Sequence, residues 1–370
     1  MANLQIIRRR IKSVKSIQKI TNAMDMIARS RFNAARDALL MNLPYVDKTR
    51  DIIRRIMTQM KGMEYEHPFI MTRQELRERA EVGENKKFLF LVIASDKGLA
   101  GAYASNVFKE AHETIEDDGS EETSTVAKEE NFHKKNFDAL KDLAVMKGKP
   151  GMKQMKATQG HISASSKTSG AAPSHANLSV AKEFNDADYI DGIELITVGR
   201  KATTHFKQRG YNIIKSYHGI SERPSYKYAQ EIADLIMERF MSGEILDVTM
   251  IYTQFKSAIS CTPDDVTLLP IITDDYNFDD NMSTKDEYIY EPDAVSVLND
   301  FLPKRLATRI YGAMLHSAAS ELSSRMNAMS NATDNAQELI GKLGLYYNKV
   351  RQAGITNEIN EIVGGAEALK

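Results

Sequence analysis

Residues 291–370 carry the sequence feature that most constrains the fold: an apolar repeat with the period of an α-helix and no proline after Pro303. Side chains such as Leu306, Ile310 and Met314 recur every third or fourth position as far as Val350, which places them on one stripe of a single helix. At about 1.5 Å per residue, seventy residues would form a helix roughly 105 Å long. Ordinary domains are much smaller than that across. This helix must therefore leave its domain and lie against another long helix.

The other candidate for a long helix is at the start of the chain, residues 1–62. Its apolar residues also follow steps of three and four, which predicts an amphipathic helix that continues, with a disturbance at Pro44, to about Met60. The first part of this stripe consists of Leu4, Ile7, Ile11, Val14, Ile17, Ile20, Met24 and Ile27. We therefore expect the two ends of the chain to pair.

The N-terminal helix is also strongly basic, although the whole chain has a formal net charge of −1. Between residues 1 and 36, Asp25 is the one acidic residue among Arg8, Arg9, Arg10, Lys12, Lys15, Lys19, Arg29, Arg31 and Arg36. Three interpretations stay open at this point: a solvated face, a surface for nucleic acid or anionic lipid, and a surface for an acidic protein partner. The second is weakened because no aromatic residues alternate with the charges.

Residues 86–272 alternate between strand and helix patterns. The run 88–94 is continuously apolar, as expected for a strand covered on both faces. Further strands are predicted at 193–198, 212–217, 247–256 and 266–271, the last two as a hairpin across Cys261-Thr-Pro-Asp, and helices at about 102–115, 201–209 and 226–241. The fold class is therefore α+α/β, with a central Rossmann-like domain and a largely parallel sheet.

Two stretches have little apolar content. Residues 117–186 begin acidic and become rich in Lys, Ser, Ala, Gly and Thr, which predicts a mostly flexible insertion with one short helix at 131–146. Residues 274–300 are acidic and are expected to lead into the C-terminal helix, 291–370.

No catalytic or cofactor motif is evident. The chain lacks GxxxxGK[ST] and GxGxxG, its eight histidines are scattered, and its one cysteine, Cys261, suits a small buried side chain in a reducing compartment. The turn 95–101 follows a strand and opens a helix, so its amides could hold an anion, although most such turns are only turns. No apolar run is long enough to span a bilayer, and the N-terminus lacks a secretory signal. We expect no enzyme activity, no cofactor, no metal site and contact with a membrane only through partners.

Three motifs resemble the gamma subunit of F-type ATP synthases. They are Ser16-Ile-Gln-Lys-Ile-Thr-Asn-Ala-Met-Asp-Met-Ile-Ala28, Ser95-Asp-Lys-Gly-Leu-Ala-Gly-Ala-Tyr103, and the C-terminal pair 325–336 and 347–368. They occur in the family's order and leave out about 117–186, which is not a general feature of the family. The resemblance implies a bacterial-type rotor shaft with an unusual insertion.

In that family the first and last helices form an antiparallel coiled coil inside a hexamer of alternating alpha and beta subunits. The α/β domain lies at the base against the epsilon subunit and the membrane c-ring. The resemblance thus implies a single-copy, non-catalytic subunit that couples ion flow to ATP synthesis or hydrolysis by rotation. It also implies a peripheral location on the cytoplasmic side of a bacterial cell membrane.

The resemblance also implies partner contacts. Arg351, Gln352 and Thr356 match the positions where the shaft contacts a beta subunit, and a guanidinium suits bidentate pairing with a carboxylate. The expected further contacts with acidic loops are Arg325, Lys12, Lys15 and Lys19. Two other functions stay open: a coiled-coil scaffold or adaptor that uses the basic helix, and a small-molecule enzyme that uses the α/β domain.

Overall fold

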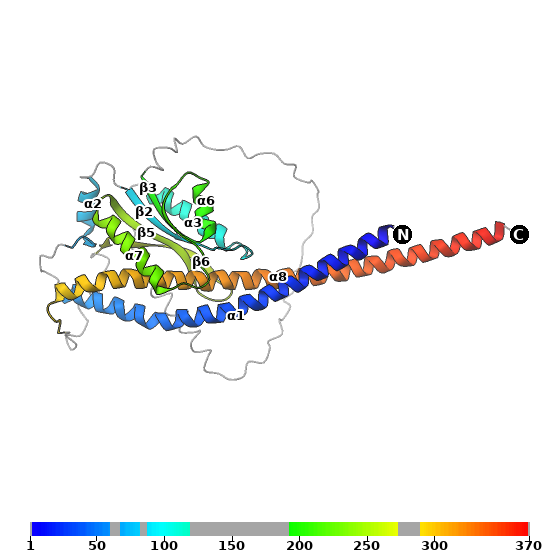
Figure 1. Ribbon diagram of the computed structural model, residues 1–370, viewed down its shortest axis with the longest axis horizontal. Coiled ribbons are helices and arrows are strands. Elements are labelled where there is room, and N and C mark those ends of the chain that lie inside the picture. Colours follow the sequence, from blue (N-terminus) through cyan, green and yellow to red (C-terminus); the bar gives the residue numbers. More distant parts are fainter. Residues whose placement is uncertain (1, 60–66, 82–86, 119–191, 273–288, 369–370) are drawn as a thin grey trace, which may run out of the picture.

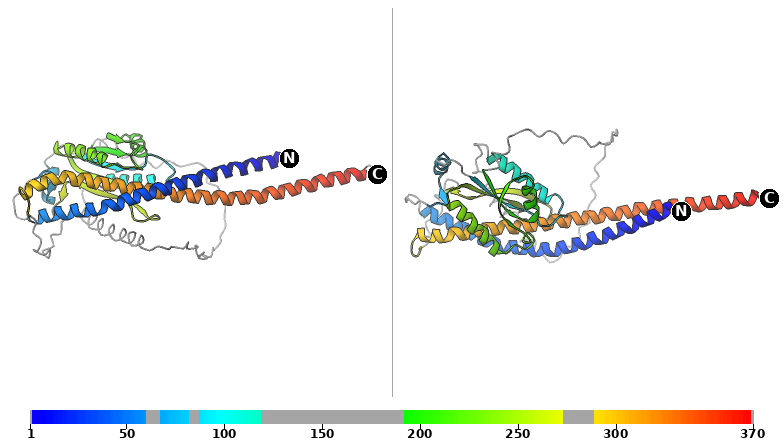
Figure 2. Two further views of the ribbon diagram at one scale, coloured as in Figure 1. Left: turned by 60° about the horizontal axis from the view of Figure 1, so that its bottom comes forward. Right: turned by 45° about the horizontal axis from the view of Figure 1, so that its top comes forward.

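The computed structural model describes residues 2–59, 67–81, 87–118, 192–272 and 289–368. Two helices dominate it, α1 (Ala2–Gln59) and α8 (Ala294–Ala368), of 58 and 75 residues. They lie side by side and run in opposite directions, so that both ends of the chain lie at the same end of the molecule (Figures 1 and 2). The predicted antiparallel coiled coil is therefore confirmed, and α1 passes through Pro44 without ending.

The central domain is built on a five-stranded sheet in the order β4-β3-β2-β5-β6. The first four strands are parallel and β6 is antiparallel to β5, which confirms the α/β domain with a largely parallel sheet. The strands are β2 (Lys87–Ile93), β3 (Ile193–Val198), β4 (Asn212–Tyr217), β5 (Ile245–Phe255) and β6 (Cys261–Leu269).

Helices cover both faces of this sheet, and the coiled coil supplies part of one layer. Phe90 and Val92 of β2 pack in the apolar cluster with α3 (Tyr103–Asp118) and α6 (Arg200–Lys207). The alternate residues Leu89 and Leu91 pack in the cluster with α7 (Tyr226–Met241), α1 and α8. Burial on both faces explains why β2 has a continuous apolar run. Because α1 and α8 cover one of these faces, the shaft is an integral layer of the domain.

The β5–β6 hairpin differs from its prediction. The chain turns within residues 256–260, and Cys261-Thr-Pro-Asp, which the sequence placed in the turn, begins β6 instead. Pro263 is tolerated there because β6 is the edge strand.

Three short elements were not predicted at all. The two-residue strands β1 (Ile70–Met71) and β7 (Ile271–Ile272) pair in parallel, and α2 (Arg73–Glu81) follows β1. Strands of two residues are too short to produce a periodic signal.

The seam of the protruding coil also differs from the apolar stripe expected for α1. The buried residues recur every seven positions, at Ile7, Val14, Thr21 and Ala28, as in a coiled coil. The predicted contacts Ile17, Ile20, Met24 and Ile27 are between 37% and 55% exposed. On α8, Met329 and Ala336 are buried in the same part of the coil. A single partner helix covers only a narrow seam, so the other apolar residues of α1 stay on the surface.

Several predicted segments fall outside the described residues. These are nearly all of the insertion 117–186, including the short helix at 131–146, and most of the acidic connector 274–300.

Candidate functional site: the protruding coil and its junction with the domain

The coil leaves the α/β domain as a slim rod (Figure 1). Two side-chain pairs fix its register, Gln18 Nε2 to Gln337 Oε1 at 2.6 Å and Thr21 Oγ1 to Thr333 Oγ1 at 2.7 Å. Because the helices are antiparallel, extending this register to the start of α1 places Ala2 opposite about Gln352. From there α8 continues without α1 beside it to Ala368.

Six of the seven predicted contact residues lie exposed on this rod. Arg351, Gln352 and Thr356 are exposed where α1 begins and α8 starts to run alone. Lys12, Lys15 and Lys19 are exposed on α1, and their spacing of three and four puts them on one face. The rod therefore presents a cationic face and, at its end, a guanidinium beside an amide.

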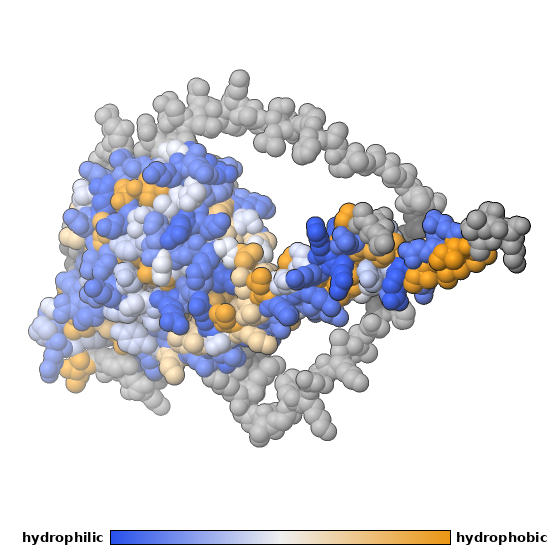
Figure 3. Space-filling view, turned by 45° about the vertical axis from the view of Figure 1, so that its right-hand side comes forward, coloured by the Kyte–Doolittle hydropathy of each residue, from blue (hydrophilic) through white to orange (hydrophobic). Residues whose placement is uncertain are grey.

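Apolar side chains are also exposed along the rod. Figure 3 shows hydrophobic patches that alternate with hydrophilic ones as the coil leaves the body. Near the end of α8, Ile355, Ile359, Ile362 and Val363 are 49% to 71% exposed and share one side of the helix. Contiguous exposed apolar residues of this kind mark an interaction surface.

Arg325 has a different environment from the other six. Its side chain is 11% exposed, and its guanidinium pairs with Glu321 at 2.5 Å and with Glu222 at 3.2 Å. The guanidinium of Arg325 is thus already paired within the chain. Its contact with an acidic loop of a partner stays a prediction. Sequence reasoning missed Glu222, since nothing local links it to residues 31, 97 or 325.

The turn 95–101 contributes an anion, the carboxylate of Asp96, to backbone donors in two other segments. The carboxylate accepts hydrogen bonds from the backbone N–H groups of Arg200 and Ser221, each at 3.1 Å, and the first of these is at the N-terminus of α6. Burial raises the pKa of Asp96, but the backbone donors Gly219, Ser221 and Arg200 together outweigh burial and hold this pKa below its usual value. Asp96 therefore ties three loops together, in keeping with the interpretation of 95–101 as a structural turn.

The crevice where this topology normally binds a ligand is filled by α8. In open α/β sheets that crevice lies beyond the carboxyl ends of the strands, where the strand order reverses, here between β2 and β5. The backbone N–H groups of Thr253 and Phe255, at the end of β5, donate to Ser317 Oγ and His316 Nδ1, both at 3.3 Å. The hydroxyl of Ser320 donates back to the carbonyl of Thr253 at 3.4 Å. The small residues of α8 thus let the shaft close the crevice.

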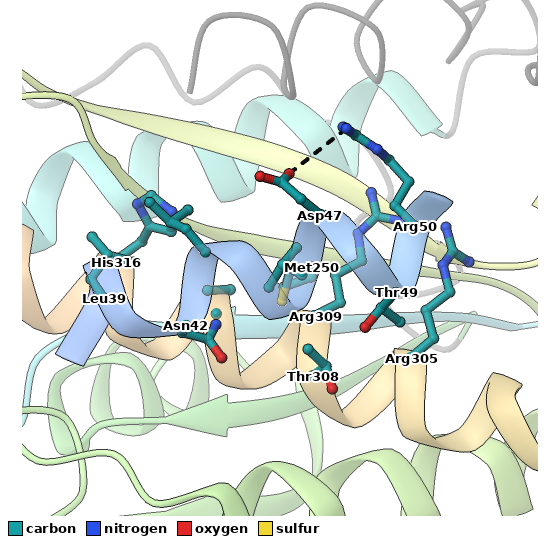
Figure 4. Close-up of a pocket in the computed structure, with 14 residues that line it drawn as sticks. Leu39, Asn42, Asp47, Thr49, Arg50, Met250, Arg305, Thr308, Arg309 and His316 are labelled. Carbon is teal, nitrogen blue, oxygen red and sulfur yellow. Dashed lines mark ion pairs between the residues drawn. The ribbon is translucent and has the colours of Figure 1, made fainter. Parts of the chain in front are cut away.

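A cavity of about 70 Å³ lies between α1, α8 and β5. Its lining includes Leu39, Met250, Thr308 and three arginines. Asp47 lies 3.7 Å from one of them, Arg50, and Figure 4 marks this ion pair. Pockets that bind cofactors or substrates measure about 300–1,000 Å³. This cavity is therefore a gap in the packing with room for a few water molecules.

Metal sites and membrane spans are both absent from the described part of the chain. No group of three or more His, Cys, Asp or Glu side chains there is arranged to hold a metal ion. Among the helices of that same part, none has a stretch apolar and long enough to cross a membrane.

These features define a class of protein. A long antiparallel coiled-coil shaft carries an α/β domain, and the shaft closes the ligand crevice of that domain. A family model described as ATP synthase matches residues 3–171 and 169–369, two segments that meet inside the predicted insertion. The ATP synthase gamma chain of Pelotomaculum thermopropionicum is 32% identical over 370 residues, and that of Halothermothrix orenii is 34% identical; each alignment covers 100% of both chains. This chain belongs to the gamma-chain family of ATP synthases, as the three motifs indicated.

A solved structure supports the fold. A chain in the OSCP/F1/c-ring structure of Euglena gracilis mitochondrial ATP synthase, rotational state 3, superposes with a TM-score of 0.52. The match covers 100% of this chain and 95% of that chain at 15% sequence identity. At that identity the likeness shows the fold alone.

Proposed function

We propose that this chain is the central shaft of a rotary ATP synthase and couples ion flow through the membrane ring to ATP synthesis or hydrolysis by turning. Family membership supports this role. The observation that carries it is the rod itself: α8 leaves the domain and runs past the start of α1 (Figure 1). Apolar side chains are exposed on this rod (Figure 3), and so are the cations Lys12, Lys15, Lys19 and Arg351.

The partners follow from this role. The rod lies inside a hexamer of alpha and beta subunits, and the α/β domain lies against the epsilon subunit and the membrane c-ring, with one copy of the chain per complex. The complex holds the chain on the cytoplasmic side of a bacterial cell membrane. Each angle of an asymmetric shaft favours one conformation of each beta site, so rotation exchanges tight for loose nucleotide affinity.

The shaft itself has no catalytic role. The crevice at which an α/β enzyme of this topology would bind its substrate is occupied by Ser317 and His316 of α8, and the nearby helix N-terminus is taken by Asp96. These contacts disfavour the small-molecule enzyme as an alternative. They support a chain that acts through its shape.

Co-purification and rotation test this function. Tagged chain expressed with the other subunits should bring down alpha and beta subunits with one shaft per three pairs, and a probe fixed to the domain should turn when ATP is added. A scaffold or adaptor would bring down neither subunit. A DNA-binding adaptor would instead bind duplex DNA with an affinity that falls steeply with salt.

Arg351 and Gln352 are the proposed contacts with a beta subunit. The double variant Arg351→Ala with Gln352→Ala should lower coupled ATP synthesis about fivefold or more, at the lower end of typical coupling between sites. Nucleotide affinity at isolated beta sites should not change. The matched control is Asn348→Ala with Lys349→Ala, two exposed residues one helical turn earlier. Coupled synthesis that is equal in both double variants would remove Arg351 and Gln352 from the contact surface.

A further inference from the structure

Glu222 lies at the centre of an ion cluster that the proposed function does not yet use. It stands in the loop between β4 and α7, and its side chain is 12% exposed. Three cations contact its carboxylate: Lys97 Nζ and Arg325 Nη1, each at 3.2 Å, and Arg31 Nη1. Burial raises the pKa of Glu222, but the hydrogen bond from Lys97 and the nearby positive charges outweigh burial and hold this pKa below its usual value. The carboxylate is therefore ionised at neutral pH.

The three cations come from three separate parts of the fold. Lys97 belongs to the turn after β2 and so to the same domain as Glu222, whereas Arg31 is on α1 and Arg325 is on α8. One carboxylate of the domain thus contacts both helices of the coil.

Arg325 makes a second connection between shaft and domain. Its Nε and Nη2 donate to the carbonyl oxygen of Gly98, both at 3.4 Å, in the turn after β2. Its Nη2 also pairs at 2.5 Å with Glu321, one helical turn earlier on α8, whose side chain is 1% exposed. The guanidinium is thereby fixed by its own helix while it reaches the domain.

The position of the cluster along the shaft matters. In the apolar cluster that joins β5 to the coil, Phe32 is the first residue from α1 and Leu322 is the last from α8. Arg31 precedes the first of these directly, and Arg325 follows the last by three residues. The ion cluster therefore stands where the apolar interface ends and the coil leaves the domain.

We propose that Glu222 is a positioning residue that fixes the angle of the α/β domain about the shaft, so that torque passes between them without slip. This inference rests on the proposed function. Apolar contacts between domain and shaft are non-directional, and the hydrogen bonds from β5 to Ser317 and His316 reach α8. The charge-assisted hydrogen bonds of Glu222 fix orientation against both helices, because they reach Arg31 of α1 and Arg325 of α8. Glu222 is the carboxylate that Arg31, Lys97 and Arg325 share, so Glu222→Gln removes the one negative charge that all three contact.

The first experiment measures the geometry in the full chain. Spin labels at Met41→Cys on α1 and Lys207→Cys on α6, both exposed positions, in a Cys261→Ser background report the distance between shaft and domain. Glu222→Gln should broaden or shift this distance distribution, and Glu222→Asp should restore most of it. The matched control is Glu113→Gln, which removes the same charge from an exposed pair with Lys109 on α3.

The second experiment measures coupling in the assembled complex. With Glu222→Gln, ATP-driven ion pumping per ATP hydrolysed should fall about fivefold or more, while assembly and ATP hydrolysis persist. A merely structural role would lower the melting temperature and leave this ratio intact, and that result would overturn the proposal. An unchanged distance distribution, or equal effects from Glu222→Gln and Glu113→Gln, would overturn it too.

The two experiments separate this inference from the proposed function. If the wild-type complex shows no coupled pumping, the rotor function fails. The distance measurement in the full chain then still decides whether Glu222 positions the domain.

Discussion

Replacing Thr21 by valine tests how the two helices of the rod keep their register. Thr21 is 8% exposed in the seam, and its hydroxyl is 2.7 Å from that of Thr333. Each hydroxyl carries one proton, and each also lies within reach of a carbonyl of its own helix, Gln18 at 3.1 Å and Met329 at 2.9 Å. One hydroxyl therefore donates across the seam while the other donates to its own helix.

The magnitude follows from this arrangement. Either single Thr→Val variant removes one hydrogen bond across the seam, whose net value is about 1 kcal/mol. The hydroxyl that remains can still donate to its own helix, so the cost should not rise far above that. The double variant places two isosteric apolar groups face to face and should be neutral to within about 0.5 kcal/mol. Two single costs of about 1 kcal/mol each and a double variant near zero give the pair a coupling energy of about 2 kcal/mol.

Native-state hydrogen exchange of the backbone amides around both residues supplies the measurement, because it reports the opening free energy of the coil itself. The control cycle pairs Thr333→Val with Thr49→Val. Thr49 is equally buried, but it lies on the part of α1 beside the domain and bonds to the carbonyl of Tyr45 in its own helix. Distant sites should be additive to within about 0.5 kcal/mol. Additivity in the Thr21–Thr333 cycle as well would refute the reasoning.

Two further predictions concern the domain and its contact with the shaft. Gly199→Ala should prevent stable folding, because φ at Gly199 is +99° and an added Cβ would lie 2.3 Å from a backbone carbonyl oxygen at the end of β2. Circular dichroism and solubility measure this loss, with Gly210→Ala as the control, since Gly210 has a similar φ of +84° but open space around it. If both variants lost the fold equally, backbone strain and not the close approach would be the cause. The buried His316 should destabilise the fold in acid, since burial lowers its pKa to about 4. Between about pH 6.5 and pH 4 the unfolded state binds more protons than the folded state. The free energy of unfolding should therefore fall by about 3 kcal/mol as the pH is lowered through this window. Unfolding of His316→Asn followed across this range should show a smaller dependence on pH, and an unchanged dependence would contradict the assignment.

Local sequence pattern determined much of this protein. The helical period required a rod longer than any domain, the apolar run at 88–94 required a strand covered on both faces, and the three motifs indicated the family. Such signals are readable because each depends on residues within a few turns of one another.

The seam of the coil was less accessible to sequence reasoning. Apolarity alone selected Ile17 and Ile20 as contacts, whereas the seam passes through Thr21 and Ala28. In this protein some apolar residues of α1 are buried in the seam and others are exposed on the rod. Both kinds recur with the same helical spacing, so the sequence pattern cannot distinguish the seam from the exposed apolar surface.

The junction between shaft and domain was decided by tertiary structure alone. Glu222 contacts cations 191, 125 and 103 residues away, and α8 fills a crevice formed by strands more than 60 residues earlier in the chain. Exposed turns and acidic residues look alike in sequence whether they are solvated or paired. The coil lies across the carboxyl ends of β2 and β5. This placement closes the ligand crevice of the sheet, and it brings Arg31 and Arg325 to Glu222.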